Sequence, residues 1–312
     1  MPEVVGGPDP QPAPATARAR RASRTAQYVA LYRALETLER GREPLFRDDF
    51  AARFLTPDLR LAVRLARLPG VKRRLEGYAD RRAPGARTSA IGRTRFIDDV
   101  VRGAAAEGLD QLVILGAGYD ARAHRLPALR NARIFEVDRA ETQREKRARL
   151  AGCAAARDDV RYVPLDLAQE DLGAALAAAG WSAARPTIFV WEGVTNYLRA
   201  EDVAGVLRFV GGTAPRGRIV FTYVHRGAID GSVPFPGAAE IRRNVERLGE
   251  PWTFGLAPEQ LRTYLAGFGL ALEEDLGADA YRARFLGSDG PFAGYAFYRV
   301  AVARVERTPG AR

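Results

Sequence analysis

The chain alternates short apolar runs with longer segments in which apolar residues recur at helical spacing. Apolar runs bounded by turn residues predict strands at 111–116, 132–137, 160–164, 187–192 and 217–224. Segments with helical spacing lie between or after these runs, at 120–126, 139–151, 170–179 and 200–213. Strands that alternate with helices predict a parallel sheet with both faces covered, and the continuously apolar runs are typical of such doubly buried strands.

The residues before the first strand predict a group of helices. Helical spacing indicates a helix at 24–40, two short helices near 47–55 and 58–68, and a helix at 89–107 that leads into the first strand. The short helix at 58–68 separates its residue types: Arg60, Arg64 and Arg67 lie on one face, and Leu61, Leu65 and Leu68 lie on another. We interpret it as an amphipathic surface helix.

The segment 226–256 interrupts the alternation, because it is rich in glycine and proline. We interpret it as an insertion after the fifth strand that is helical near 237–248, and loops of this length are usually functional. A helix at 257–267 then precedes strands at 270–276 and 294–305, which we expect to end the sheet as an antiparallel pair. The predicted fold is therefore α/β: a doubly wound, mostly parallel, Rossmann-like sheet of seven strands.

The length of 312 residues and a hydrophobic content of 47% suit one large domain with elaborations. Residues 1–23 begin with a stretch rich in proline, glycine and alanine and are expected to be a disordered arm. The single domain would cover 24–312, divided into a helical cap (24–88), a cofactor-binding core (89–225), the insertion (226–256) and a C-terminal helix with strands (257–312).

Composition excludes several kinds of site. The single cysteine, Cys153, rules out an intrachain disulfide and a cysteine-based zinc cluster and suits a reduced, cytoplasmic setting. Only two histidines are present, so we expect no metal site. The net charge of +10 comes almost entirely from arginines scattered along the helices, which we interpret as solvated faces. We therefore expect neither a nucleic-acid nor a membrane partner.

The most informative segment runs from the first predicted strand to Asp138. It reads as a strand, the turn Gly116-Ala117-Gly118, a helix, a second strand and then Asp138. An open α/β sheet holds a nucleoside cofactor with this arrangement, because glycines let the backbone approach the ligand and the acidic residue accepts hydrogen bonds from ribose hydroxyls. The turn also fits the dinucleotide fingerprint, so alone it indicates a dehydrogenase and a methyltransferase equally.

Three further features bear on that choice. Asp166 and Leu167 directly follow the third strand, where a carboxylate and a backbone N–H can bind an adenine. Glu192 ends the fourth strand, and a buried carboxylate there needs a cation, which could be an α-ammonium, a sulfonium or one of the chain's many arginines. Arg93 lies on the helix before the glycine turn and could bind a carboxylate through two parallel hydrogen bonds.

Several blocks of the sequence then resemble one known family. The blocks are Thr25-Ala26, Arg33-Ala34-Leu35-Glu36, Pro44-Leu45-Phe46-Arg47-Asp48, Arg93-Thr94-Arg95-Phe96-Ile97-Asp98, Leu115-Gly116-Ala117-Gly118-Tyr119-Asp120-Ala121-Arg122, Phe135-Glu136-Val137-Asp138 and Trp191-Glu192-Gly193-Val194-Thr195-Asn196-Tyr197-Leu198. With them the chain resembles the class I S-adenosylmethionine (SAM) methyltransferases of the leucine carboxyl methyltransferase type, especially the bacterial branch that methylates small metabolites and polyketides. The resemblance covers about residues 24–225.

The resemblance implies a role for each matching position. Arg93 would bind the methionine carboxylate of SAM, and Glu192 would lie near its α-amino group. The turn Gly116-Ala117-Gly118 would pass beneath the amino-acid moiety, Asp138 would hold the ribose, and Asp166 and Leu167 would bracket the adenine. The implied activity is transfer of a methyl group from SAM, leaving S-adenosylhomocysteine, to a carboxylate or hydroxyl of a small molecule, which we expect to be a secondary metabolite.

The acceptor decides which further residues are needed. A carboxylate is ionised at neutral pH and requires no general base, whereas a hydroxyl does. His225 ends the fifth strand beside the insertion and could be that base, while Tyr197 and Tyr223 could line the acceptor pocket. His124 follows the glycine turn and is expected to be structural.

Two other interpretations stay open at this point. An NAD(P)-dependent oxidoreductase could use the same glycine turn, but it would need a catalytic Tyr-Lys or His-Asp pair. No lysine is suitably placed for this, because Lys146 belongs to the helix after Asp138. The basic charge would also permit an RNA-binding methyltransferase, although no appended RNA-binding domain and no cluster of basic and aromatic residues is visible. The sequence does not indicate an oligomeric state.

Overall fold

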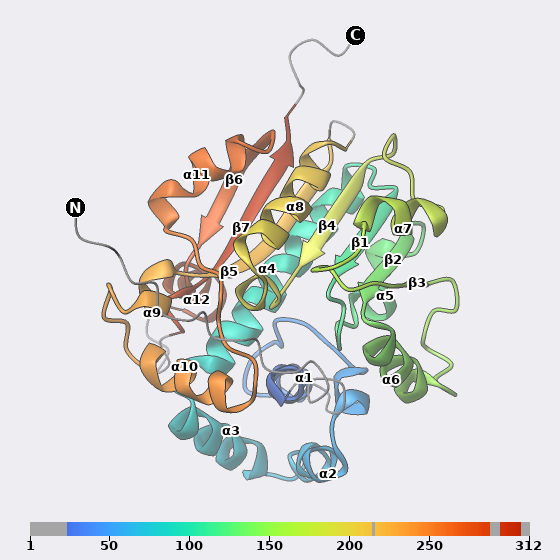
Figure 1. Cartoon of the computed structure of the whole chain (residues 1–312). Helices are drawn as coiled ribbons and strands as arrows, with labels where there is room; N and C mark the ends of the chain where they lie inside the picture. Colours follow the sequence, from blue (N-terminus) through green and yellow to red (C-terminus); the bar gives the residue numbers. More distant parts are fainter. Residues whose placement is uncertain (1–23, 214–215, 288–293, 307–312) are drawn as a thin grey trace, which may run out of the picture.

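A twisted seven-stranded sheet forms the centre of the computed structural model, which describes residues 24–213, 216–287 and 294–306 (Figure 1). The order of the strands is β3-β2-β1-β4-β5-β7-β6. Their bounds are β1 Gln111–Leu115, β2 Arg133–Asp138, β3 Arg161–Pro164, β4 Thr187–Trp191, β5 Arg218–Val224, β6 Leu270–Leu276 and β7 Tyr298–Val305. Strands β1 to β5 are parallel, and β7 is antiparallel to both β5 and β6. The predicted fold class and the antiparallel ending are confirmed.

Most helices also lie where the pattern of the sequence predicted them. They are α1 Arg24–Thr37, α2 Pro57–Leu65, α4 Ala86–Ala106, α5 Arg122–Arg125, α6 Ala140–Leu150, α7 Leu172–Ala178, α8 Ala200–Gly211 and α11 Pro258–Ala266. The segment expected to be helical near 47–55 contains only a short 3-10 helix, η2, at Ala51–Phe54. Two more 3-10 turns, η3 Pro127–Leu129 and η4 Thr195–Tyr197, follow α5 and β4.

Outside the insertion after β5, two helices of the described residues were missed by the sequence prediction. The first is α3, Val71–Arg82, in which a central glycine and a highly basic composition weaken the apolar pattern. The second is α12, Ala278–Leu286, which occupies the connection between the last two strands and packs on α4. The insertion after β5 carries α9, Arg226–Asp230, as well as the expected helix α10, Ala238–Arg247.

The two faces of the sheet are buried by different helices, as Figure 1 shows. Alternate residues of each strand point to opposite faces, so Val113 and Leu115 join one apolar cluster while Leu112 and Ile114 join the other. The first cluster includes residues of α7, α8 and α11, and the second includes residues of α4, η3 and α12. Burial of both faces explains why the strands are continuously apolar.

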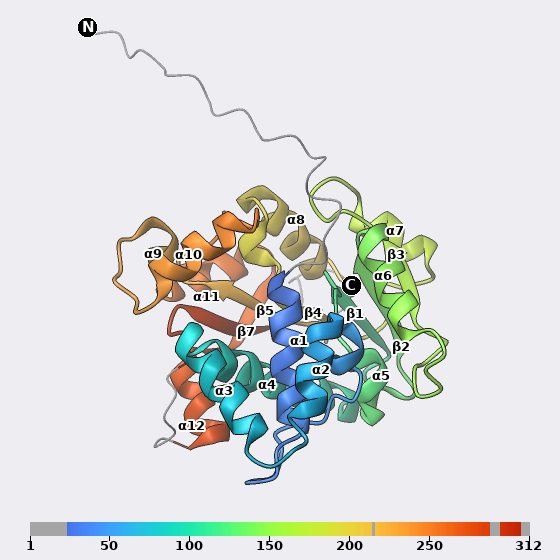
Figure 2. The same cartoon turned by 90° about the horizontal axis from the view of Figure 1, so that it is seen from below.

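The N-terminal helices cover the end of the sheet to which the parallel strands point. Figures 1 and 2 show α1 crossing beneath this end, with α2 and α3 further out. Residues of α1, η2 and α2 form an apolar cluster with Tyr119 and Ala121, which follow the first strand, and with Leu150 of α6. A direct polar contact joins the layers, because the Arg33 guanidinium donates to the Tyr119 carbonyl oxygen at 2.6 Å.

His124 lies in α5 beneath this cap, and its ring is in contact with the Phe50 ring at a centroid distance of 5.5 Å. Its Nδ1 accepts a hydrogen bond from the Arg157 backbone N–H at 3.2 Å. Burial, reinforced by the positive charge of Lys146, lowers the pKa of His124 from 6.5 to about 4. The imidazole is therefore neutral in the folded protein, in keeping with the structural role expected for it.

We predict that His124 makes the fold sensitive to acid. The unfolded chain protonates this histidine below about pH 6.5, whereas the folded chain protonates it only near pH 4. The neutral imidazole therefore contributes fully to stability above pH 6.5, and this contribution is lost as the pH falls through 4. In His124→Gln, the free energy of unfolding, measured by urea titration, should fall less between pH 6.5 and pH 4 than in the wild type. Parallel curves for the two proteins would contradict the prediction.

Candidate functional site

The predicted cofactor residues follow four neighbouring parallel strands and meet at one edge of the sheet. The glycine turn follows β1, Asp138 ends β2, Asp166 lies just past β3, and Glu192 directly follows β4. Since β2 and β4 pair with opposite sides of β1, the chain reverses its direction of winding at β1. Ligands of open α/β sheets bind outside the carboxyl ends of the strands at such a switch point.

The glycine turn holds Asp138 beside it. The Gly118 N–H donates to Asp138 Oδ2 at 2.6 Å, and the Arg139 N–H donates to Oδ1 of the same carboxylate at 2.7 Å. Gly116 has φ of +62°, and a Cβ at this position would collide with the side chain of Val194. The buried Ala117 continues the hydrogen bonding between β1 and β2, because its N–H donates to the Val137 carbonyl at 3.0 Å. The turn thus needs a glycine and fixes a carboxylate next to its own backbone.

Arg93 and Glu192, which are 99 residues apart in the sequence, form an ion pair at this edge. Arg93 Nε lies 2.7 Å from Glu192 Oε1, and the guanidinium also lies over the Tyr298 ring, 4.8 Å from its centroid. Burial opposes ionisation of the Glu192 carboxyl, but Arg122 and Arg93 outweigh burial, and the pKa of Glu192 lies well below its usual range. The two predicted ligands of an amino-acid group are therefore adjacent and oppositely charged.

Glu192 has a second partner that extends the pair into a buried network. Arg122 Nη1 lies 2.7 Å from Glu192 Oε2, and the same guanidinium binds Asp98 and Asp120. The network continues through Arg125, which lies 2.6 Å from Asp98, to Asp48 and Arg33. Its eight members are Arg33, Asp48, Arg93, Asp98, Asp120, Arg122, Arg125 and Glu192.

Four arginines and four carboxylates balance the charge of this network. The Arg122 side chain is completely buried, and its Nη2 has no hydrogen-bond partner among the described residues. A buried charge that loses its partner costs several kcal/mol. The network therefore joins α1, α4, α5 and the end of β4 into one unit, and Arg93 and Glu192 form its end at the sheet edge.

Asp166 and Leu167 lie just past β3, which pairs with β2. The Leu165 N–H donates to the Asp138 carbonyl at 2.9 Å, which carries the chain from β3 past the end of β2. Asp166 Oδ1 accepts from the Ala168 N–H at 3.0 Å, and Leu167 packs against the apolar cluster on one face of the sheet. Both residues therefore follow directly after a residue that is bonded to the main chain of Asp138.

Tyr197 and Tyr223, both expected in the acceptor pocket, lie in different places. Tyr197 is in η4 within the apolar cluster that also contains Tyr298, and burial and the nearby Tyr298 raise its pKa above the usual range. Tyr223 points to the opposite face of β5 from Thr222, whose Oγ1 accepts from the Gly193 N–H at 2.7 Å. The Tyr223 hydroxyl instead donates to Asp275 at 3.0 Å, so the placement predicted for it needs correction.

His225 begins α9 and caps its first turn. Its Nδ1 accepts from the Gly227 N–H at 3.0 Å, and its ring packs against the Phe235 ring at a centroid distance of 4.9 Å. With the Nδ1 lone pair engaged, the neutral ring carries its proton on Nε2. This tautomer can donate a hydrogen bond but has no free lone pair for a proton, so the arrangement does not suit the general base that the sequence suggested.

Of the eight members of the network, only Arg93 and Glu192 were predicted from the sequence as site residues. Seven of its eight members lie inside the blocks that carried the family resemblance, and Arg125 lies three residues beyond one of them. The signal was therefore the presence of Asp120 and Arg122 directly after the glycine turn, in a block already singled out. Among the described residues, no group of three histidine, cysteine or acidic side chains could hold a metal ion.

The order of the strands, the glycine turn and the acidic end of β2 define the class I methyltransferase fold. Solved structures agree. A methyltransferase from Thermobifida fusca, titled as putative, has a TM-score of 0.55 at 20% identity over 89% of this chain and 94% of its own. A DUF574 family protein from Streptomyces avermitilis has a TM-score of 0.56 at 14% identity over 92% of this chain and 98% of its own. These similarities show the fold.

The family follows from sequence comparison. The model of the family "Leucine carboxyl methyltransferase" matches residues 26–211. A Frankia alni protein named "Putative S-adenosyl-L-methionine-dependent methyltransferase" is 40% identical over 66% of this chain and 70% of its own length. A Streptomyces coelicolor protein with the same description is 37% identical over 69% and 75%. The chain belongs to the leucine carboxyl methyltransferase family and is a SAM-dependent methyltransferase.

We predict that Arg122 is essential for stability. Arg122→Met leaves Asp98, Asp120 and Glu192 without their shared buried cation, and the free energy of unfolding should fall by about 3–5 kcal/mol. Denaturant titration measures this, with Arg144→Met as the matched control, because Arg144 forms an exposed ion pair with Glu141. The control should cost less than about 1 kcal/mol, and an equally small loss for Arg122→Met would show that the network does not stabilise the fold.

Proposed function

We propose that this methyltransferase transfers a methyl group from SAM to an oxygen of a small molecule, and that the acceptor is a carboxylate. The observation that carries the proposal is the convergence of two features at one sheet edge. One is the glycine turn with Asp138 bonded to it, and the other is the adjacent ion pair of Arg93 and Glu192. The first suits a nucleoside, and the second suits an amino-acid group with both charges.

The residues at this edge fit the chemical groups of SAM. Arg93 would donate to the carboxylate, and Glu192 would accept from the α-ammonium while it keeps Arg122 as a partner. Asp138 has free acceptor capacity for ribose hydroxyls beyond its two backbone donors. Asp166 and Leu167 would bracket the adenine beside it. Gly116 lets Val194 pack directly against the turn, which holds the turn close to the end of β4.

When bound, the sulfonium supplies a methyl group that is already activated, so the protein's contribution is alignment and exclusion of water. The buried network fixes the orientation of Arg93 and Glu192, because each guanidinium and carboxylate in it is held by another. Helix α1 covers the turn through the contact of Arg33 with the Tyr119 carbonyl. The fixed edge and its cover would hold the methyl donor in one orientation out of water.

An aromatic cluster beside Arg93 supports an apolar or aromatic acceptor. The cluster contains Phe235, Trp252, Phe297, Tyr295 and Tyr298, of which Tyr298 also contacts the Arg93 guanidinium. The insertion and α1 close over this region, since the Thr25 hydroxyl donates to Glu250 at 3.0 Å. Clusters of aromatic residues with a few polar groups are typical of small-molecule sites.

The arrangement of His225 favours a carboxylate over a hydroxyl acceptor. A hydroxyl must lose its proton during methyl transfer, but the Nδ1 atom of His225 already accepts from Gly227. A carboxylate is ionised at neutral pH and needs no such group. The family resemblance further supports a small metabolite, and we extend the proposal to a secondary metabolite methylated in the cytoplasm.

We predict that Asp138→Ala weakens the binding of S-adenosylhomocysteine without unfolding the protein. Loss of charge-assisted hydrogen bonds to the ribose should cost about 1–3 kcal/mol, which raises Kd by about 5- to 150-fold. Isothermal titration calorimetry measures the change, with Asp158→Ala as the control, because Asp158 is an exposed carboxylate away from the sheet edge.

The same titration tests the rival interpretation. NAD(H) and NADP(H) should not bind. Their binding in place of S-adenosylhomocysteine would favour an oxidoreductase and contradict the proposal. An unchanged Kd in Asp138→Ala, with binding intact in the wild type, would remove only the ribose assignment.

We also predict that His225→Asn keeps methyl transfer to a carboxylate acceptor within about threefold of the wild type, because the asparagine oxygen can replace Nδ1 in capping Gly227. Transfer of radiolabelled methyl groups to a panel of aromatic carboxylic acids and phenols measures this. His225→Ala, which removes the cap, is the companion variant. A loss of about 100-fold or more in both variants, confined to phenols, would show that His225 is a base for a hydroxyl acceptor.

A further inference from the structure

The positive charge of the chain is concentrated on one part of the helical cap. Residues 53–82, which include α2 and α3, contain nine arginines or lysines and three acidic residues. These 30 residues therefore carry +6 of the net charge of +10. The arginines were expected to be scattered along the helices, but their charge is concentrated in this segment.

Most of these cations are not neutralised by neighbours. The acidic residues Glu76 and Asp80 are already bound by Lys72 and Arg87. The exposed arginines without a carboxylate partner among the described residues are Arg53, Arg64, Arg67, Arg73, Arg74, Arg81 and Arg82. A surface with this many unpaired guanidinium groups attracts anions over an extended area.

Apolar side chains protrude among these arginines. Leu61, Leu65, Leu68 and Tyr78 are 55%, 46%, 55% and 56% exposed. We call these four residues, together with the seven unpaired arginines, the α2–α3 face. Large apolar side chains exposed on both α2 and α3, on a cap that also carries unpaired charge, suit a partner that accepts both.

The exposed leucines of α2 are not needed to attach this helix to the rest of the protein. Leu59, Val63 and Ala66 recur at helical spacing and pack into the cap, with Val63 and Ala66 buried. Leu61 and Leu65 repeat the same spacing on a second stripe of α2 that faces solvent, and the exposed Leu68 lies in the turn just after the helix. A helix needs one such stripe to attach to its own protein, so the second stripe is available for another surface.

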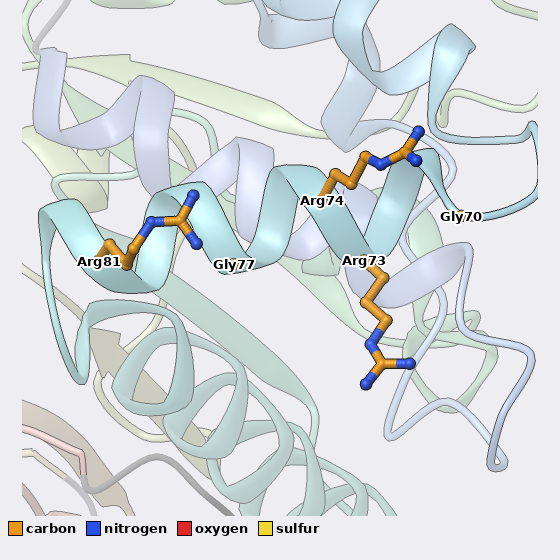
Figure 3. Close-up of a pocket in the computed structure, with 5 residues that line it drawn as sticks. All are labelled: Gly70, Arg73, Arg74, Gly77 and Arg81. Carbon is orange, nitrogen blue, oxygen red and sulfur yellow. The ribbon is translucent and has the colours of Figure 1, made fainter.

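The arginines are arranged for a broad anionic surface and not for one ligand. Figure 3 shows Arg73 and Arg74 extending to different sides of α3, with Arg81 about two turns further along. They line a shallow hollow of about 440 Å³ with Gly70 and Gly77, and a second hollow of about 360 Å³ on α2 is lined by residues that include Arg64 and Arg67. Guanidinium groups bind phosphodiesters well, and several binding positions spread over two helices match a layer of phosphates.

We propose that the α2–α3 face docks on a membrane that contains anionic phospholipids. The exposed leucines and Tyr78 enter the interface between head groups and acyl chains, and the arginines bind the surrounding phosphates. None of the helices in the described part of the chain combines the length and the apolar character needed to cross a bilayer, so the association is peripheral. The proposal replaces the expectation that the chain has no membrane partner and does not depend on the proposed function.

The test is sedimentation of the full chain with phospholipid vesicles. The protein should bind vesicles of equal parts phosphatidylglycerol and phosphatidylcholine, and it should bind pure phosphatidylcholine vesicles far less. Raising the salt concentration should weaken the binding, since the arginines are exposed to solvent.

Two sets of variants locate the surface. Arg64→Gln with Arg67→Gln should weaken the partition onto anionic vesicles by about 30-fold, whereas the control pair Arg130→Gln with Arg262→Gln, exposed on other parts of the molecule, should not. Leu61→Gln with Leu65→Gln and Leu68→Gln should weaken it by at least about tenfold. The control for the leucines is Leu248→Gln, an exposed leucine after α10.

Four outcomes would overturn the proposal. The first is no binding to anionic vesicles, and the second is an equal loss in the surface variants and their controls. The third is binding unaffected by the leucine changes, which would indicate a phosphate site alone. The fourth is occupation of the face by protein: binding to poly-L-glutamate but not to vesicles, or a dimer in size-exclusion chromatography that the leucine changes dissociate.

Discussion

The complete burial of Arg122 is the constraint on which the rest of the site depends. Its guanidinium contacts Asp98 on α4, Asp120 after the glycine turn and Glu192 after β4. Because a buried charge without its partner costs several kcal/mol, these segments cannot shift independently. Arg125 extends the same requirement to Asp48 and hence to the cap. The positions of Arg93 and Glu192 therefore depend on the folding of several distant segments together.

This arrangement makes the candidate site ready for a ligand with two charges. Arg93 and Glu192 neutralise each other in the structure, so neither side chain is left as an unpaired buried charge. A group with a carboxylate and an ammonium can take the place of each partner, while Glu192 keeps its contact with Arg122. A ligand with only an ammonium group that displaced Arg93 from Glu192 would leave Arg93 without its carboxylate partner. Electrostatic balance alone thus favours an amino-acid group at this edge of the sheet, in agreement with the family.

The sequence predicted what local patterns determine. Continuous apolar runs located the strands, and the spacing of 20 residues between Gly118 and Asp138 correctly brought them together, because two parallel strands joined by one helix end at the same edge. The ion pairs of Arg122 connect residues up to 70 positions apart, and arginines are so frequent here that no single one is distinguished. The placement of Tyr223 in the acceptor pocket could not be decided from the sequence for a different reason. Alternation along β5 shows that Tyr223 and Thr222 point to opposite faces of the sheet, but only the packing of the helices shows which face adjoins the site.

The same limit applies to α2, whose pattern alone does not distinguish a solvated face from a binding surface. The pattern correctly predicted a helix with arginines and leucines on separate faces, yet α2 has two apolar stripes with equal spacing. Periodicity cannot tell which stripe faces the protein interior, because both satisfy the same helical geometry. Packing in the cap selects Val63 and leaves Leu61 and Leu65 in solvent. Folding alone therefore does not account for the second stripe, and its position among unpaired arginines is what favours an anionic membrane surface over a merely solvated helix face.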